Sequence, residues 1–404
     1  MGSFDQLRTL QPLVHAAVAA EADKIIGFVK EIVGIPSVTG DEERCALVIA
    51  GHLRKIGLEA AVVEDDPGRP NVIGTLSSGK PGPRFLFNGH IDVVPPGPRD
   101  EWVYDPFCAE IHDGRLHGRG TVDMKTGLCT GIYATDLLGR LDLPWRGTVT
   151  VTAVADEEVG GEKGIRYLLD QGLVEADMGI NCEATNLDRV DIAHKGILRS
   201  SVTITGRAIH GSRPWLGINA VDKAVDVLSA LRPLQRELDG RRHHLCGRPS
   251  LLVGTINGGT VVNMVPSRCE IGLDRRIVPG ETHEGALAEI RQVLEGVRRA
   301  DSEFKYTLKE TMRMPLLEVP ADSPPVEALI AACTVVNGQP PFIGGKDAGT
   351  DAAWIVAHTG MPMPVYGPGD YLAGSLAANE SIALKDILRA TEIYVLALLY
   401  LLGE

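Results

Sequence analysis

The sequence predicts an α/β fold: a mixed-sheet domain with helices on both faces, interrupted by a smaller inserted domain of two layers. In the first 195 residues, apolar runs of strand length alternate with helical periodicity. Near residue 196 the pattern changes to alternating apolar and polar residues, typical of half-exposed strands. The first pattern returns after about residue 313. We therefore expect residues 1–195 and 313–404 to form the larger domain and residues 196–312 the inserted one.

In the first segment, helices and strands follow one another closely. An amphipathic helix opens the chain, and Asp41 or Thr39 caps the helix that begins near residue 42. Strands that are continuous apolar runs are typical of a sheet buried on both faces. The expected helices are 21–33, 42–56, 125–139 and 162–171, and the expected strands are 71–76, 84–88, 148–153 and 178–181.

The inserted segment has the order β-α-β-β-α-β, which is typical of a small two-layer unit. Its expected strands are 197–205, 250–257, 267–276 and 303–309, and its expected helices are 218–238 and 282–299. A proline-rich stretch at 315–325 leads back to the larger domain. There we expect a helix at 326–336, a glycine-rich loop at 344–350 and a final helix after Ser381.

Composition excludes several classes of protein. A formal net charge of −13 over 404 residues leaves no basic excess to neutralise phosphates, which disfavours a nucleic-acid partner. No run approaches the roughly 18 apolar residues of a membrane span, so we expect no membrane partner. The seven cysteines are odd in number and contain no Cys-x-x-Cys pair, which favours a reducing compartment, and we expect a cytoplasmic protein.

Metal-binding side chains follow the apolar strand-like runs. His90 and Asp92 follow the run at 85–89, Glu157 and Glu158 follow the run at 149–155, and Glu183 follows the run at 178–182. Such folds place their sites at the carboxyl edge of the sheet. Imidazole and carboxylate groups are the donors of a hydrolytic Zn²⁺ site.

Asp123, in the glycine-rich turn 118–125, joins this set. Taken alone, Asp123 is explained equally well as a helix cap or as a metal ligand. His90 and Asp92, taken alone, are explained equally well as ordinary loop residues or as site residues. Adjacent acidic residues after a buried strand repel one another, which destabilises the fold unless a cation neutralises them or the residues have different roles. One carboxylate would bind a metal ion while its neighbour takes a proton from water. Cys182 is either a thiolate ligand or, as we favour, a small buried hydrophobe.

Four segments resemble one known family. They are NGHIDVVP (88–95), GRGTVDMK (118–125), ADEEVGG (155–161), and CEAT (182–185) where the family has EPT. The chain resembles the zinc metallopeptidases and deacylases that include acetylornithine deacetylase, succinyl-diaminopimelate desuccinylase, aminoacylase-1 and the glutamate carboxypeptidases. The resemblance implies a catalytic domain with an inserted lid and dimerisation domain, and a cis peptide bond after Asp123.

The resemblance also implies the role of each residue in the larger domain. His90 and Glu183 would bind one zinc ion, Asp123 would bridge two ions, and Glu158 would bind the second. Glu157 would be the general base, and Asp92 would orient the neighbouring site residues without binding a metal ion itself.

The resemblance also implies roles for residues of the inserted lid domain. His210 resembles the histidine that reaches across the dimer to polarise the scissile carbonyl. Asn263, Arg276 and Gly349 resemble substrate-binding positions, and a guanidinium such as that of Arg276 suits a carboxylate. Without the resemblance, a lid histidine or arginine is more often a solvated surface group.

One family residue is absent near the C-terminus. The family has Gly-Pro-Gly, then Ala-His, with an acidic residue four positions after the histidine. Here Gly-Pro-Gly stands at 367–369 and the acidic residue is Glu380, which puts Leu376 or Ser375 in place of the histidine. The chain then holds one zinc ion, or holds two with water or His117 filling the gap, or is a repurposed member with a non-hydrolytic biosynthetic or binding role.

The sequence thus predicts a cytoplasmic, homodimeric amidohydrolase with one or two Zn²⁺ ions, Co²⁺ or Mn²⁺ being the other candidates. Its substrate would be an N-acyl amino acid or a small peptide with a free carboxylate. The alternative is a family member with an incomplete metal site that binds a ligand or performs non-hydrolytic chemistry.

Overall fold

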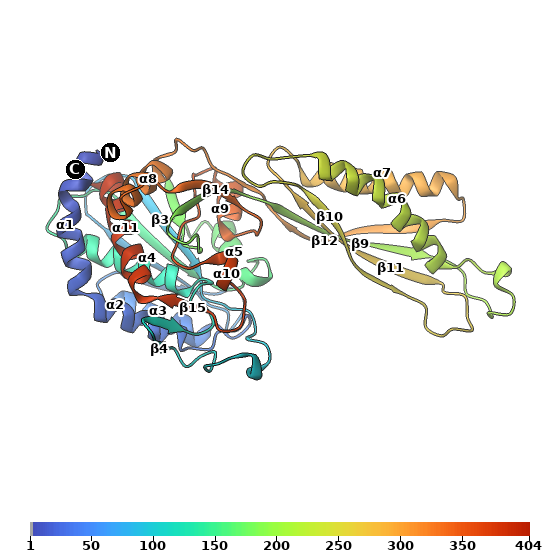
Figure 1. Ribbon diagram of the computed structural model, residues 1–404, viewed down its shortest axis with the longest axis horizontal. Coiled ribbons are helices and arrows are strands. Elements are labelled where there is room, and N and C mark those ends of the chain that lie inside the picture. Colours follow the sequence, from blue (N-terminus) through green and yellow to red (C-terminus); the bar gives the residue numbers. More distant parts are fainter. Residues whose placement is uncertain (1–2) are drawn as a thin grey trace. The chain divides into compact units, whose positions relative to one another are not determined.

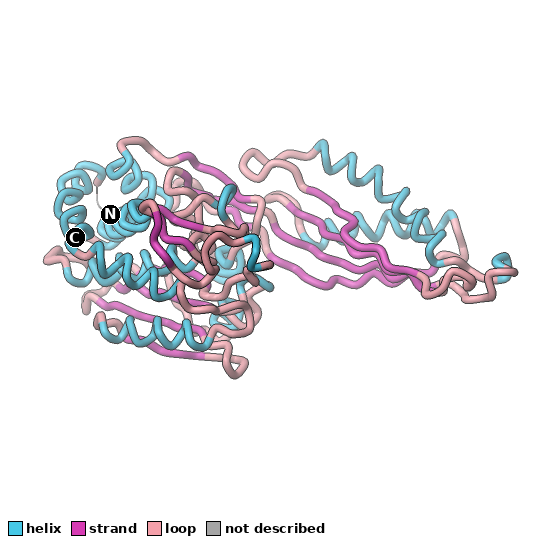
Figure 2. The backbone as a smooth tube through the Cα atoms, turned by 60° about the horizontal axis from the view of Figure 1, so that its bottom comes forward, coloured by secondary structure: helices cyan, strands magenta, loops and turns pink. Residues whose placement is uncertain are grey.

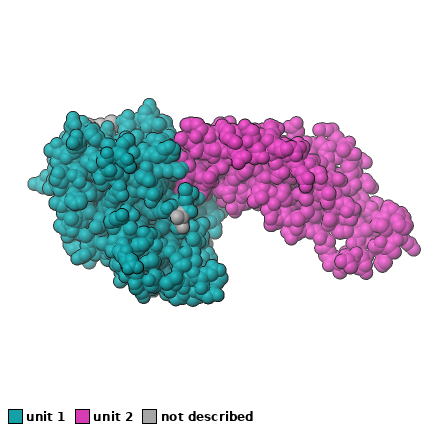
Figure 3. Space-filling view, in the orientation of Figure 1, with its two compact units in different colours: residues 1–192, 319–344, 350–404 teal, residues 193–318, 345–349 magenta. Residues whose placement is uncertain are grey.

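The computed structural model describes residues 3–404, with the side chain of residue 373 left aside. The chain forms two compact units (Figure 3). Unit 1 contains residues 1–192, 319–344 and 350–404, and unit 2 contains residues 193–318 and 345–349. The domain limits that we expected at 195/196 and 312/313 stay a prediction, because a compact unit is not by itself an independently folding domain.

A five-stranded mixed sheet forms the centre of unit 1 (Figure 1). Its order is β1-β2-β6-β3-β7, where β3 runs parallel to β6 and β7 while β2 runs antiparallel to β1 and β6. The mixed sheet predicted from the sequence is confirmed. The strands are β1 (Glu59–Val63), β2 (Asn71–Ser77), β3 (Arg84–His90), β6 (Thr148–Val154) and β7 (Met178–Asn181).

Helices pack on both faces of this sheet. Helix α4 contacts β3 from one face, where its Gly131 lies against Phe87, and α9 contacts β3 and β7 from the other (Figure 1). The last helix, α11, is almost entirely buried because it packs on α1, α4 and α8. The helices of unit 1 are α1 (Phe4–Ala20), α2 (Ala22–Val33), α3 (Glu43–Lys55), α4 (Lys125–Arg140), α5 (Ile165–Asp170), α8 (Pro324–Asn337), α9 (Asp351–Thr359), α10 (Tyr371–Gly374) and α11 (Leu384–Leu402).

Unit 2 is a four-stranded antiparallel sheet with two helices on one face (Figure 2). The chain order is β9-α6-β10-β11-α7-β12, and the sheet order is β10-β11-β9-β12. Its core is formed by apolar side chains of the helices and of the sheet face beneath them, among them Val202, Leu231 and Ile290. The elements are β9 (Gly196–Thr205), α6 (Ala220–Gly240), β10 (Ser250–Gly258), β11 (Arg268–Ile277), α7 (His283–Ala300) and β12 (Lys305–Met314).

Several short strands were not predicted. Five of them, β4 (Glu110–His112), β5 (Arg115–His117), β8 (Arg189–His194), β13 (Leu317–Glu318) and β15 (Ser381–Ala383), have two to six residues. So short a run shows too little periodicity to be distinguished from a loop. We expected a glycine-rich loop at 344–350, but its first residues belong to strand β14 (Phe342–Lys346). The sheets that these strands form have the orders β15-β5-β4 and β13-β8-β14.

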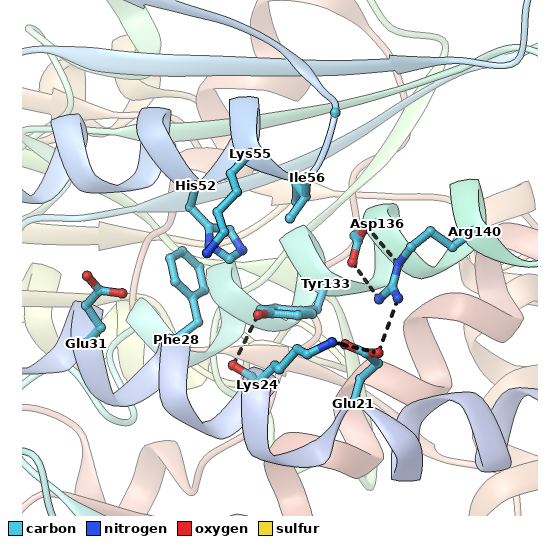
Figure 4. A pocket seen from close by; sticks show the side chains of 11 residues that line it. Glu21, Lys24, Phe28, Glu31, His52, Lys55, Ile56, Tyr133, Asp136 and Arg140 are labelled. Carbon is cyan, nitrogen blue, oxygen red and sulfur yellow. Dashed lines mark hydrogen bonds and ion pairs between the residues drawn. The ribbon is translucent and has the colours of Figure 1, made fainter.

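A cavity of about 650 Å³ lies between α2, α3 and α4 of unit 1 (Figure 4). Three rings line part of it: His52 stacks on Phe28 with ring centroids 3.7 Å apart, and Tyr133 lies 5.4 Å from His52. His52 Nε2 is buried and has no hydrogen-bond partner among the described residues. Burial and the charge of Lys55 lower the pKa of His52 to about 4.

His52 should make unfolding sensitive to mildly acidic pH. Its side chain binds a proton near pH 6.5 in the unfolded chain but only near pH 4 in the folded one. The unfolded state therefore binds more protons in this window, and stability is lost as pH falls from about 6.5 to about 4. We expect His52→Asn to flatten the fall in unfolding free energy, measured by denaturant titration at several pH values. Parallel curves for His52→Asn and the unchanged protein would contradict this account.

Candidate metal centre

The parallel pairing of β3 with β6 and β7 brings three strand ends to one edge of the sheet. His90, the last residue of β3, pairs with Val154 at the end of β6, and Asn88 pairs with Asn181 at the end of β7. The side chains that follow these strands are therefore neighbours, although they lie up to about ninety positions apart in the sequence.

His90 lies at the centre of the cluster and is 1% exposed. Its Nδ1 lies 2.8 Å from the backbone oxygen of Asp92, which can only accept, so Nδ1 carries a proton. Its Nε2 faces three carboxylates: Asp123 Oδ1 at 3.1 Å, Glu183 Oε1 at 3.3 Å and Glu157 Oε2 at 3.9 Å. Burial lowers the pKa of His90, but its bonds to Asp123, Asp92 and Glu183 and the charge of Glu157 outweigh that effect and raise the pKa well above the ordinary value.

Asp92 fixes the acidic turn after β6. Its Oδ1 accepts a hydrogen bond from Glu157 N at 3.1 Å, and its Oδ2 accepts from Glu158 N at 3.3 Å and from Thr39 Oγ1 at 2.8 Å. Asp92 is fully buried, so these donors satisfy a carboxylate that water cannot reach. The residue therefore positions Glu157 and Glu158 through their backbone.

The three acidic residues of this turn have different environments. Asp156 has a left-handed backbone (φ 72°) and binds Arg69 at 2.7 Å, and Arg69 also binds Glu42. Among the described residues, Glu157 and Glu158 have no arginine partner, and each belongs to one of the groups of acidic and histidine side chains around His90. Burial, with the charges of neighbouring carboxylates, raises the pKa of Glu157 well above its ordinary value and the pKa of Glu158 to about 8.

Asp123 is held by its backbone and by both carboxylate oxygens. The N–H groups of Val122 and Asp123 donate to Glu380 Oε1 at 2.6 and 3.0 Å, and Glu380 Oε2 pairs with the buried Arg119 at 2.6 Å. Asp123 Oδ1 faces His90, and Oδ2 accepts a hydrogen bond from Ser375 Oγ at 2.6 Å. The peptide bond after Asp123 is cis, as the resemblance implied.

These side chains fit a divalent cation. The cluster contains two overlapping groups of three residues, and within each group the ligand atoms lie within 4.8 Å of one another. One group is His90, Asp123 and Glu158, and the other is His90, Glu157 and Glu183. Glu158 Oε1 is buried without a hydrogen-bond partner among residues 3–404. Like charges packed this closely are unfavourable unless a cation or protons neutralise them, and a bound cation would reverse the rise in their pKa values.

Asp351, at the start of α9, was not predicted as a site residue. It is 1% exposed, so its carboxylate is almost completely removed from water. Burial raises its pKa to about 8 against the opposing effect of His90, and the charges of Asp92 and Glu183 add to the rise. An acidic residue just after a glycine-rich loop was the signal that could have identified it.

Two other candidate ligands lie elsewhere. His117 on β5 packs against the rings of Tyr104 and His112, at centroid distances of 4.7 and 6.0 Å, and belongs to neither ligand group. Cys182 is fully buried, and burial raises the pKa of its thiol to about 12, so it remains a thiol. It behaves as the small buried hydrophobe that we favoured.

The predicted lid residues lie in unit 2. The His210 and Asn263 segments are adjacent, since Gly211 N donates to Asn263 O at 2.7 Å. His210 is exposed, and its Nδ1 lies 2.8 Å from Ser212 Oγ. Arg276 on β11 pairs with Asp274 at 2.7 Å. A side chain at Gly349 would displace the Met314 side chain, whose Sδ lies 2.0 Å from the point that a Cβ atom would occupy.

The α/β fold and the carboxylate–imidazole cluster at the edge of its sheet define a metal-dependent hydrolase. Residues 86–400 match the family described as peptidase family M20/M25/M40. The chain belongs to this family, whose members are metallo-hydrolases that act on amide bonds.

Curated relatives cover most of the chain. It is 29% identical over 360 residues to the uncharacterized protein YgeY of Escherichia coli, covering 85% of this chain and 86% of that protein. It is 26% identical over 374 residues to N-formyl-4-amino-5-aminomethyl-2-methylpyrimidine deformylase of Bacillus subtilis, covering 85% and 86%. It is 29% identical over 380 residues to succinyl-diaminopimelate desuccinylase of Parvibaculum lavamentivorans, covering 90% and 92%.

Solved structures share the fold. The M20 family metallo-carboxypeptidase Sso-CP2 from Sulfolobus solfataricus superposes with a TM-score of 0.77 at 20% identity, covering 94% of this chain and 99% of that one. Human carnosine dipeptidase 1 superposes with a TM-score of 0.75 at 18% identity, covering 97% and 98%.

Asp92→Asn should weaken metal binding. An amide has only one acceptor oxygen, so it cannot accept from Thr39 and from both N–H groups of the acidic turn. We expect a loss of about 10–100-fold in zinc affinity, measured by competition with a chromophoric chelator. Thr39→Val is the control, because it removes one donor and leaves both backbone bonds, and its effect should be smaller. Equal affinities for Asp92→Asn and the unchanged protein would refute this role.

Proposed function

We propose that the protein hydrolyses the amide bond of an N-acyl amino acid or of a small peptide with a free carboxylate. The observation that carries the proposal is the convergence of His90, Asp123, Glu157, Glu158 and Glu183 at the carboxyl edge of the β3, β6 and β7 strands. Relatives named as a deformylase and a desuccinylase support an acyl group on nitrogen as the part that is removed.

Zinc is the proposed ion, with Co²⁺ and Mn²⁺ as the other candidates. His90 and Glu183 would hold one ion and Glu158 a second, with Asp123 shared between them, in the roles that the resemblance implies. A divalent ion bound there would polarise the scissile carbonyl and make a water molecule more acidic.

Glu157 is the proposed general base. Its carboxylate lies within 3.9 Å of His90 Nε2, and its backbone is held by Asp92. Glu158 belongs to one of the two ligand groups and Glu157 to the other. The assignment of Glu157 as base and of Glu158 as ligand is therefore part of the proposal. In this scheme Glu157 takes a proton from the attacking water and later protonates the leaving amine.

The lid residues complete the proposal. His210 would stabilise the oxyanion of the tetrahedral intermediate. Arg276 would bind the substrate carboxylate after releasing Asp274, and Asn263 and the backbone of Gly349 would orient the substrate.

The cellular location is also a proposal. All seven cysteines are free thiols, which agrees with a reducing cytoplasm. Among the residues that the structure describes, no helix is both long and apolar enough to span a membrane.

Glu157→Gln should abolish turnover and leave the metal bound. The amide cannot take a proton, so we expect kcat to fall by about 10²–10⁴-fold. Release of amine from N-formyl, N-acetyl and N-succinyl amino acids and from dipeptides measures activity, and elemental analysis measures metal. Glu162→Gln, an exposed neighbour, is the matched control and should retain activity. Hydrolysis retained by Glu157→Gln would refute the assigned base.

Unit 2 should mediate a homodimer. Strand β10 is an edge strand, and on it Leu252 and Ile256 are 60% and 47% exposed. Val225 on α6 is also exposed. We expect a dimer by sedimentation equilibrium, with Ile256→Asp shifting it to monomer, whereas Leu47→Asp, an exposed site on α3, should not. A monomeric unchanged protein at micromolar concentration would contradict this.

A further inference from the structure

The two ligand groups share a single imidazole, which limits the chemistry open to a second ion. His90 Nδ1 is occupied by the backbone carbonyl of Asp92, so only Nε2 is available to an ion. Both groups of candidate ligands depend on that nitrogen. Once one ion has taken Nε2, a second ion in the cluster finds oxygen donors only.

Ser375 adds an oxygen donor to this second position. Asp123 contacts His90 through Oδ1 and Ser375 Oγ through Oδ2, at 3.1 and 2.6 Å. Glu158 belongs to the same ligand group as Asp123, and its Oε1 is buried with no hydrogen-bond partner in the described chain. Asp123, Glu158 and Ser375 therefore provide two carboxylates and a hydroxyl beside the imidazole position.

The segment that carries Ser375 is tied to the loop that carries Asp123. Arg119, which is 2% exposed, donates to Leu376 O at 3.2 Å and to Ala377 O at 3.3 Å while it pairs with Glu380. Leu376 has a left-handed backbone (φ 61°), which is unusual for leucine. These contacts hold the Ser375 hydroxyl against Asp123.

We propose that the centre is asymmetric. One position contains the His90 imidazole and takes zinc or cobalt. The other, formed by Asp123, Glu158 and Ser375, contains only oxygen donors and takes a hard cation such as Mn²⁺ or Mg²⁺. This inference rests on the proposed metal-dependent function and adds the chemical class of the second ion.

Metal titration of the full-length protein tests the asymmetry without an activity assay. Protein stripped with chelator is loaded with one equivalent of Zn²⁺ and titrated with Mn²⁺, and the free Mn²⁺ is measured by electron paramagnetic resonance. We expect one equivalent of Mn²⁺ to bind per chain. Ser375→Ala should weaken that step about tenfold or more and leave the zinc step unchanged.

Two further variants sharpen the test. Ser381→Ala removes a nearby hydroxyl that contacts Arg115 and not Asp123, so Mn²⁺ binding should be unchanged. Ser375→His adds an imidazole next to Asp123, and it should convert the second position to one that binds zinc. Circular dichroism checks that each variant is folded.

Two results would overturn the proposal. One is a second zinc ion that binds the unchanged protein as tightly as the first, and the other is Mn²⁺ binding that is identical in Ser375→Ala. Either result leaves the proposed hydrolase standing. A protein that binds no ion at all would overturn both this inference and the proposed function.

Discussion

Repulsion among the carboxylates around His90 is the constraint on which the rest of unit 1 depends. Asp123, Glu157 and Glu183 lie within 4 Å of its Nε2, in a site that is nearly closed to water. Such a cluster holds its shape only if each carboxylate is fixed by donors or by a cation. The fold supplies donors at its periphery: backbone N–H groups for Asp92 and Glu380, and the guanidinium groups of Arg69 and Arg119 for Asp156 and Glu380. The centre is left for a cation.

The same arrangement explains why the acidic residues have different roles. Asp156 and Glu380 are paired with arginines and shape loops, whereas His90 is the one cationic group that pairs with Glu157 among the residues that the structure describes. Ser375 extends this pattern with a neutral donor, because a hydroxyl can satisfy Asp123 without adding charge. Membership of peptidase family M20/M25/M40 fixes the class of reaction.

Much of the fold and site could be predicted from the sequence, for physical reasons. Buried parallel strands are continuous apolar runs, and His90, Glu157 and Glu183 stand at or just beyond their ends, so their convergence follows from sheet geometry. The short strands β5 and β15 could not be predicted, because three residues show no periodicity. Asp351 and the bond from Ser375 to Asp123 were missed because both depend on contacts between distant parts of the chain. The predicted roles of His210, Asn263, Arg276 and Gly349 stay predictions.

Anomalous diffraction from zinc-soaked crystals of the protein tests the central claim most directly. The account predicts a strong peak at the zinc edge within bonding distance, about 2 Å, of His90 Nε2 and of carboxylate oxygens from Asp123 or Glu183. The absence of any peak beside His90 after saturating zinc, with the carboxylates turned away from the imidazole, would contradict it.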